Sequence, residues 1–82
     1  MKLKIIYRIN LKMSPGKLAE QCVHAAIGLG VSQYYMSVVV LHASDKKFWE
    51  IVNSTGNIFV VHDAGRTEVD PGTPTCAAFI EE

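Results

Sequence analysis

The most constraining feature of the sequence is a strand pattern that leads directly into the start of a helix. From Leu3 to Leu11 the odd-numbered positions are all apolar, the period of two that is typical of a β-strand. Ser14 and Pro15 follow, and this pair favours a helix start because serine caps free backbone N–H groups and proline suits the first helical position. The pattern predicts a helix from Pro15 to about Leu29.

Further apolar runs predict three more strands and a second helix. They are a strand at Val38–Leu41 buried on both faces, a short helix capped by Ser44 or Asp45 and running to Val52, a strand at Ile58–Val61, and a last strand at Cys76–Ile80. Alternation of strands and helices is typical of an α/β fold. The order strand, helix, strand, helix, strand, strand therefore predicts one α/β domain over residues 1–82, with helices packed on a largely parallel sheet.

The first predicted helix carries one polar stripe, which consists of Lys17, Gln21 and His24. On a helical wheel Glu20 lies in the same narrow polar arc, and the rest of the surface is apolar and rich in alanine and continues through Val23 and Ile27. In α/β sheets, sites form beyond the carboxyl ends of the strands. We therefore expect the start of this helix to face the polar segment at residues 62–75.

That polar segment supplies the second half of a candidate site, with Asp63, Thr73 and Thr75 among its side chains. A carboxylate, an ammonium group, an imidazole and hydroxyls suit water-driven hydrolysis or simple anion binding. Each also has a structural interpretation. The aspartate could cap the loop's backbone N–H groups, the threonines could be turn and strand residues, and His24 could be a surface histidine.

Composition limits the class of protein. The 82 residues are 49% apolar, which excludes disorder. A chain this short buries only roughly 60–65% of its unfolded surface on folding, so the interface of a homodimer would add to its thin core. Cys22 and Cys76 are too few for a disulfide framework and lack zinc-ligand spacing, so both are expected to be buried apolar residues. Without an apolar run of about 18 residues or a signal-peptide block, we expect no membrane contact and a cytoplasmic protein.

Charge is unevenly distributed along a chain whose formal net charge is zero. Residues 1–41 carry five basic residues and one acidic residue, whereas residues 42–82 carry three basic and seven acidic ones. An anionic partner would therefore meet mainly the first half. The alternative is that these lysines are solvated residues on the surfaces of strands and helices.

Two segments of the sequence resemble a known family. Residues 11–25, LKMSPGKLAEQCVHA, and the segments DAGRT at 63–67 and GTPT at 72–75 resemble, in this order, the two signature motifs of the archaeal and eukaryotic (type 2) peptidyl-tRNA hydrolases. The resemblance implies a compact, often dimeric α/β fold with a four-stranded mixed sheet. It also implies that the chain cleaves the ester between a peptide and the 3′ ribose of tRNA, with no metal or other cofactor.

The resemblance also assigns site residues. The positions that match the family's catalytic residues are Lys17, His24, Asp63, Thr67 and Thr75, and those that match positions beside them are Gln21, Arg66 and Thr73. Asp63 would orient or activate water, alone or with His24, and Lys17 would hold the tRNA 3′ end or the oxyanion. The threonine hydroxyls would position water or the leaving ribose. The candidates for phosphate contacts are Lys4, Arg8 and Lys12.

The chain is shorter than typical members of the family. The stretch between His24 and Val38 lacks room for the second helix that such proteins usually have. Retention of both motifs favours the hydrolase. The shortening and the zero net charge leave an alternative: a non-catalytic protein with the same fold that binds an RNA end, a peptide or another protein.

Overall fold

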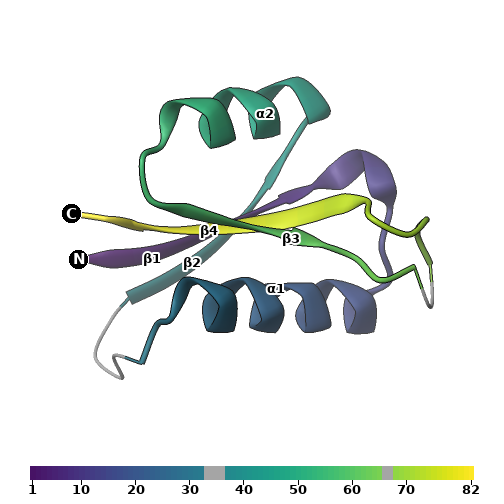
Figure 1. The fold of residues 1–82 in the computed structure, drawn as a ribbon, viewed down its shortest axis with the longest axis horizontal. Coiled ribbons are helices and arrows are strands. Elements are labelled where there is room, and N and C mark those ends of the chain that lie inside the picture. The colour runs from purple at the N-terminus through teal and green to yellow at the C-terminus, as the bar shows by residue number, and fades with distance from the viewer. Residues whose placement is uncertain (33–36, 66–67) are drawn as a thin grey trace.

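A computed structural model describes residues 1–32, 37–65 and 68–82 of the chain (Figure 1). Its elements are β1 (Lys2–Arg8), a 3-10 turn (Ile9–Leu11), α1 (Pro15–Leu29), β2 (Ser37–Ala43), α2 (Asp45–Ser54), β3 (Ile58–His62) and β4 (Pro74–Glu81). The predicted order of strands and helices is confirmed.

The four strands form one mixed sheet in the order β2-β1-β4-β3. β1 pairs with β2 in parallel, whereas β4 is antiparallel to both β1 and β3. The largely parallel sheet expected from the alternation was wrong, because β4 inserts antiparallel between β1 and β3. The four-stranded mixed sheet that the resemblance implies is confirmed. However, β1, β2 and β3 still run in one direction, so their carboxyl ends share an edge with the start of β4.

The two helices cover opposite faces of the sheet (Figure 1). Apolar residues on the α1 side form one buried cluster that includes Leu3 and Ile5, and those on the α2 side form another around Ile6 and Phe48. The central strand β4 contributes to both clusters, with Cys76, Ala77 and Ala78 fully buried. These small residues let α1 lie close to β4, because backbone can approach backbone where side chains are short.

Strand predictions failed at two places. β1 ends at Arg8, and the chain turns there through the 3-10 segment, which Lys12 ends in a left-handed conformation with φ of 52°. The predicted strand over residues 3–11 was therefore too long. Residues Val38 and Leu41 were expected to be buried, but they are 59% and 43% exposed. β2 is an edge strand, because β4 occupies the other side of β1.

The ends of α1 match the prediction. The Oγ atom of Ser14 accepts a hydrogen bond of 3.3 Å from the backbone N–H of Lys17, and Gly30 ends the helix with a φ of 89° that favours glycine. Neither described helix is long and apolar enough to span a membrane. Both cysteines are free thiols, Cys76 buried and Cys22 half-buried, and burial raises the pKa of each.

Candidate active site

Polar side chains meet at the sheet edge where β3 ends, β4 begins and α1 starts. Lys17 and Gln21 come from the first turns of α1, Asp63 follows β3 directly, and Thr75 lies near the start of β4. All four are buried. The helix start and the polar segment after β3 therefore face each other, as the sequence predicts.

The closest contact in this cluster joins two opposite charges. The Nζ atom of Lys17 lies 2.6 Å from Oδ1 of Asp63 and 3.3 Å from Oε1 of Glu20. The hydrogen bond to Asp63 raises the pKa of Lys17. The same bond lowers the pKa of Asp63 against the opposing effect of burial, assisted by the N–H of Gly65, which donates to Oδ2 at 2.6 Å. Both groups therefore stay ionised at neutral pH.

Gln21 connects this pair to the central strand. Its Nε2 group donates to Oδ1 of Asp63 at 3.2 Å and to Oε1 of Glu20 at 3.0 Å. Its Oε1 atom accepts a hydrogen bond of 2.5 Å from the hydroxyl of Thr75. Since an amide nitrogen has only two hydrogens, both are in use, and the side chain is held in one orientation.

The segment between β3 and β4 is closed at its base and tied to the helix start. The backbone N–H of Asp63 donates to the carbonyl of Thr73 at 3.0 Å, and the N–H of Gly72 donates to the carbonyl of Asp63 at 2.7 Å. Further along, the carboxylate of Glu68 accepts hydrogen bonds from the backbone N–H of Ser14, at 2.8 Å, and from its hydroxyl. These bonds lower the pKa of Glu68 and attach the loop to the first turn of α1.

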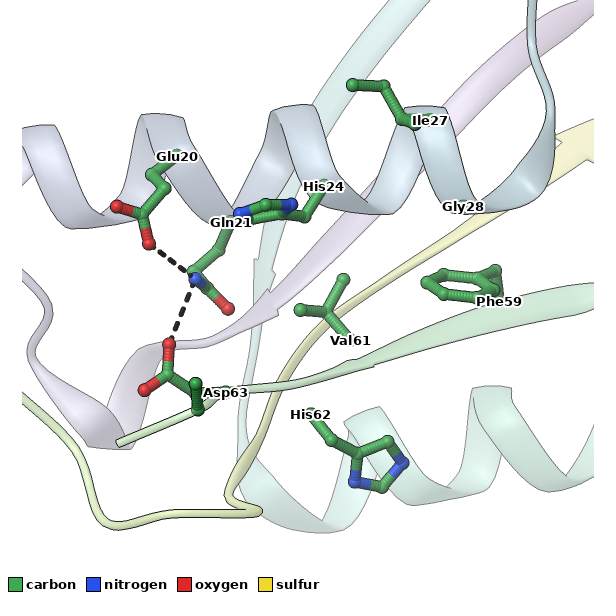
Figure 2. A pocket seen from close by; sticks show the side chains of 10 residues that line it. Glu20, Gln21, His24, Ile27, Gly28, Phe59, Val61, His62 and Asp63 are labelled. Carbon is green, nitrogen blue, oxygen red and sulfur yellow. Dashed lines mark hydrogen bonds between the residues drawn. The ribbon is translucent and has the colours of Figure 1, made fainter. Parts of the chain in front are cut away.

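A groove of about 730 Å³ adjoins the cluster, between α1 and β3. Figure 2 shows Glu20, Gln21 and Asp63 joined at one end and Phe59 beside Gly28 toward the other. His24 lines the same groove and is exposed. In the described part of the chain, no hydrogen bond joins its imidazole to Asp63. The arrangement therefore has a buried charged pair of which one member, Asp63, lines one end of an open groove.

Comparison with known proteins identifies the family. A family model described as "Peptidyl-tRNA hydrolase PTH2" matches residues 1–53. The chain is 37% identical over 92 residues to a peptidyl-tRNA hydrolase of Methanopyrus kandleri, a match that covers 92% of this chain and 79% of the relative. It is 33% identical over 94 residues to the one from Haloquadratum walsbyi, covering 96% and 84%. The chain belongs to the PTH2 family.

A relative with lower identity matches just as much of the chain. The peptidyl-tRNA hydrolase of Sulfolobus acidocaldarius is 28% identical over 102 residues and covers 96% of this chain and 85% of its own length. The family model ends before β3, whereas the match to this relative takes in nearly the whole chain. The similarity to peptidyl-tRNA hydrolases therefore extends beyond residues 1–53.

The helical wheel was right that α1 of this PTH2 chain packs through Cys22, Ala25, Ala26 and Leu29, but it made the packing side too wide. Val23 and Ile27, assigned to the apolar packing surface, are 57% and 69% exposed, whereas Lys17 and Gln21 are 6% and 1% exposed. The reason is that the segment after β3 supplies polar partners for the stripe. With those partners in place, the helix turns its polar residues toward the sheet edge.

Two of the three basic residues that were expected to contact tRNA phosphates form ion pairs within the protein. Lys4 lies 3.1 Å from Glu81, and the guanidinium of Arg8 contacts Asp45 at 2.7 Å and the carbonyl of Pro74 at 2.8 Å. Arg8 thereby joins the start of β4 to the start of α2. Lys12 is exposed and forms no ion pair with a described residue.

The remaining predicted residues of the PTH2 site differ in their placement. Arg66 and Thr67 lie outside the described residues. The hydroxyl of Thr73 donates to the carbonyl of Asp70 at 2.7 Å within the loop. Among the described residues, no group of three or more His, Cys, Asp or Glu side chains could hold a metal ion.

Sequence reasoning did not include Glu20 and Glu68 in the site. Glu20 could have been found, because it lies three residues after Lys17 and directly before Gln21 on the same helical stripe. Nothing in the sequence around Glu68 indicated that this residue contacts the start of α1. It is 54 positions away from Ser14, and only the path of the chain between β3 and β4 brings the two together.

Proposed function

We propose that this chain is a peptidyl-tRNA hydrolase that cleaves the ester between a peptide and the 3′ ribose of tRNA. The observation that carries the proposal is the buried Lys17–Asp63 pair, whose aspartate lines one end of an open groove, in a chain that belongs to the PTH2 family. Relatives that match nearly the whole chain are named for this activity. They support the hydrolase rather than the non-catalytic binding protein.

Asp63 orients the attacking water. A carboxylate accepts about four hydrogen bonds, and the described residues supply three of them, from Lys17, Gln21 and the N–H of Gly65. The remaining position can hold a water molecule at the groove. Because Lys17 lowers the pKa of Asp63, the carboxylate stays ionised but is a weak base, so positioning of water is its main contribution.

Lys17 stabilises the negative charge that develops on the ester carbonyl oxygen. An ammonium group has three N–H donors, and two of them bond Asp63 and Glu20. The third can bond the oxyanion of the tetrahedral intermediate. Since Lys17 is already held in place by two carboxylates, little reorganisation is needed as the charge forms, which is the condition for efficient electrostatic stabilisation.

His24 carries the proton in the proposed reaction. Its imidazole lines the groove close to Gln21 (Figure 2), and an imidazole can accept a proton from water and later donate it. Water attacks the carbonyl carbon, the bond between that carbon and the ribose oxygen breaks, and His24 passes the proton to that oxygen, which becomes the ribose hydroxyl. The second proton of the water is lost to solvent when the product acid ionises. The products are a peptide carboxylate and free tRNA.

The other candidates have supporting roles. The fully buried hydroxyl of Thr75 bonds Gln21, so we assign Thr75 and Gln21 to positioning Asp63 rather than to contact with the ester. Thr67 and Arg66 are proposed to contact the substrate, as the family resemblance implies, and Thr73 to hold the loop that carries them.

Release of free tRNA from N-acetyl-aminoacyl-tRNA tests the proposal. Wild type is compared with Lys17→Ala and Asp63→Asn, and with Lys46→Ala as a control on α2, on the opposite face of the sheet (Figure 1). We expect Lys46→Ala to match wild type and the two site variants to lose about 100-fold or more in kcat/KM. Circular dichroism verifies that each variant is folded. Tight binding of tRNA by wild type without release would identify a non-catalytic binding protein instead.

We further propose that the chain acts as a cytoplasmic homodimer. The core of so short a chain is thin, and the edge strand β2 leaves Val38, Val40 and Leu41 between 43% and 59% exposed. A second copy could cover this apolar surface. Cytoplasmic location follows from the proposed substrate, since peptidyl-tRNA arises during translation. A monomer mass by light scattering at micromolar concentration would contradict the dimer.

A further inference from the structure

We propose that the part of the groove formed by Ile27, Gly28, Phe59 and Val61, called here the apolar half, binds the last residues of the peptide esterified to tRNA. The enzyme then favours substrates whose peptide carries an apolar residue next to the esterified one. This inference rests on the proposed function and adds a class of preferred substrate to it.

The two ends of the groove differ in chemistry. Glu20, Gln21 and Asp63 form the polar end, and the apolar half lies further along α1 and β3 (Figure 2). Ile27 is 69% exposed and Phe59 is 39% exposed. Single apolar residues on a protein surface are ordinary. Two that line one concave site beside a charged pair fit the usual composition of a ligand pocket.

Gly28 determines the position of the aromatic ring in the apolar half. A Cβ atom at this position would lie 2.1 Å from Cε2 of Phe59, well inside contact distance. The ring can therefore lie against the helix only because residue 28 has no side chain. This close approach makes Phe59 a wall of the groove instead of a side chain that extends into solvent.

The length of the groove suits a short peptide. Phe59 and Asp63 are separated by about 13 Å along an extended strand. An extended peptide advances about 3.3–3.6 Å per residue. With the ester at Asp63, about four residues of the peptide reach from the polar end to Phe59, and the residue before the esterified one lies near Ile27 and Val61.

Charge and polarity favour the peptide over the nucleic acid as the occupant. The carboxylates of Glu20 and Asp63 at the polar end repel phosphates. A bound base needs hydrogen-bond partners for its edges, whereas the apolar half presents mainly carbon atoms. The exposed Lys12 precedes α1, at the opposite end of the helix from Ile27. The tRNA strand therefore lies toward Lys12 and the peptide toward Phe59.

Two N-acetyl-dipeptidyl-tRNAs test the inference. They share the tRNA and the esterified residue, and differ by leucine or aspartate in the preceding residue. Wild type is expected to hydrolyse the leucine substrate with a kcat/KM about tenfold or more above that of the aspartate substrate. Ile27→Asp should abolish this preference, because it adds a carboxylate to the apolar half. Phe59→Ser should reduce the preference by removing the aromatic wall.

Val23→Asp is the matched control. Val23 lies four residues before Ile27 on α1 and is also exposed, at 57%, but it does not line the groove. This variant should keep the wild-type preference. Equal rates of wild type on both substrates, or a preference that persists in Ile27→Asp, would overturn the inference while leaving the hydrolase intact. Hydrolysis of neither substrate would overturn the proposed function and this inference with it.

Discussion

The ammonium group of Lys17 lies 2.6 Å from a carboxylate oxygen of Asp63, although 46 positions separate the two residues in the sequence. The two are brought together because β3 ends at the same edge of the sheet where α1 begins, next to the start of β4. A buried ion pair adds little net stability by itself, since both charges lose their hydration. Its place at the end of a groove is better explained by the chemistry proposed above.

Stability should depend on the ionisation of Asp63. Its pKa in the folded protein is lowered chiefly by the hydrogen bond from Lys17. A carboxyl whose pKa falls on folding stabilises the fold above its unfolded value of about 3.9, and this stabilisation is lost as the pH falls through the folded pKa. We expect wild type to be more stable than Asp63→Asn near neutral pH, with a difference that shrinks below about pH 4.

Urea unfolding of both proteins from about pH 7 to about pH 3 measures this difference. Glu68, whose pKa is also lowered, titrates in both proteins, so its effect cancels in the difference between them.

On the alkaline side, stability changes with pH in the opposite direction because of Lys17, whose pKa is raised by Asp63. Its contribution is present below the unfolded value of about 10.4 and is lost as the pH rises through the folded pKa. A difference between the proteins that stays constant down to about pH 3 would contradict the account.

Thr75→Val should impair catalysis, although Thr75 itself does not contact the substrate in the proposed reaction. The change keeps the side-chain shape but removes the hydroxyl that bonds Oε1 of Gln21, which leaves a buried acceptor unpaired. We expect kcat to fall about tenfold or more with little change in KM. Thr75→Ser should restore most of the rate, and Thr55→Val, at the end of α2, should have no effect. A defect in KM alone would argue against a positioning role.

Ser14→Ala should destabilise the protein more than Ser44→Ala does. Both serines cap a helix through Oγ, which accepts from Lys17 in one case and from Lys47 in the other, at 3.3 and 3.2 Å. Loss of such a cap costs about 1 kcal/mol. Only the hydroxyl of Ser14 also holds Glu68 and thereby the loop. The loss of unfolding free energy, measured in urea, should therefore be larger for Ser14→Ala than for Ser44→Ala. Equal losses would mean that the bond to Glu68 adds nothing.

Lys12→Ala should weaken tRNA binding, whereas Lys4→Ala should not. Lys12 is exposed near the start of α1, and Lys4 is paired with Glu81 at 3.1 Å. Each phosphate contact contributes about one unit to the slope of log affinity against log salt. Filter binding of tRNA across a salt series should therefore give a slope about one unit smaller for Lys12→Ala. An unchanged slope would show that Lys12 does not contact phosphate.

Several features of the fold could be predicted because their causes are local. The helix start at Ser14 and Pro15 depends on backbone groups a few residues apart, and the structure confirms it. The second helix was predicted for the same reason, with Ser44 or Asp45 as its cap, and the structure shows that Ser44 is the cap. The candidate residues Lys17, Gln21 and Asp63 were likewise recognisable from residue type and spacing, and the structure brings them into one network.

The failures concern features that local spacing does not determine. Val38 and Leu41 look like core residues by composition, but they lie on an edge strand. Val23 and Ile27 look like packing residues of α1, but they face solvent and the groove. Periodicity gives the direction of a side chain relative to its own element. It contains no information on what lies opposite, which depends on the pairing of distant strands.

The sequence by itself therefore determined the order of the elements, the start and end of α1 and the identity of the charged groups, because each depends on neighbours along the chain. Only the tertiary structure decided that β4 lies between β1 and β3, that Lys17 is buried against Asp63, and that Glu68 reaches Ser14. These contacts join residues far apart in the chain, and their geometry is set by how the whole sheet pairs and packs.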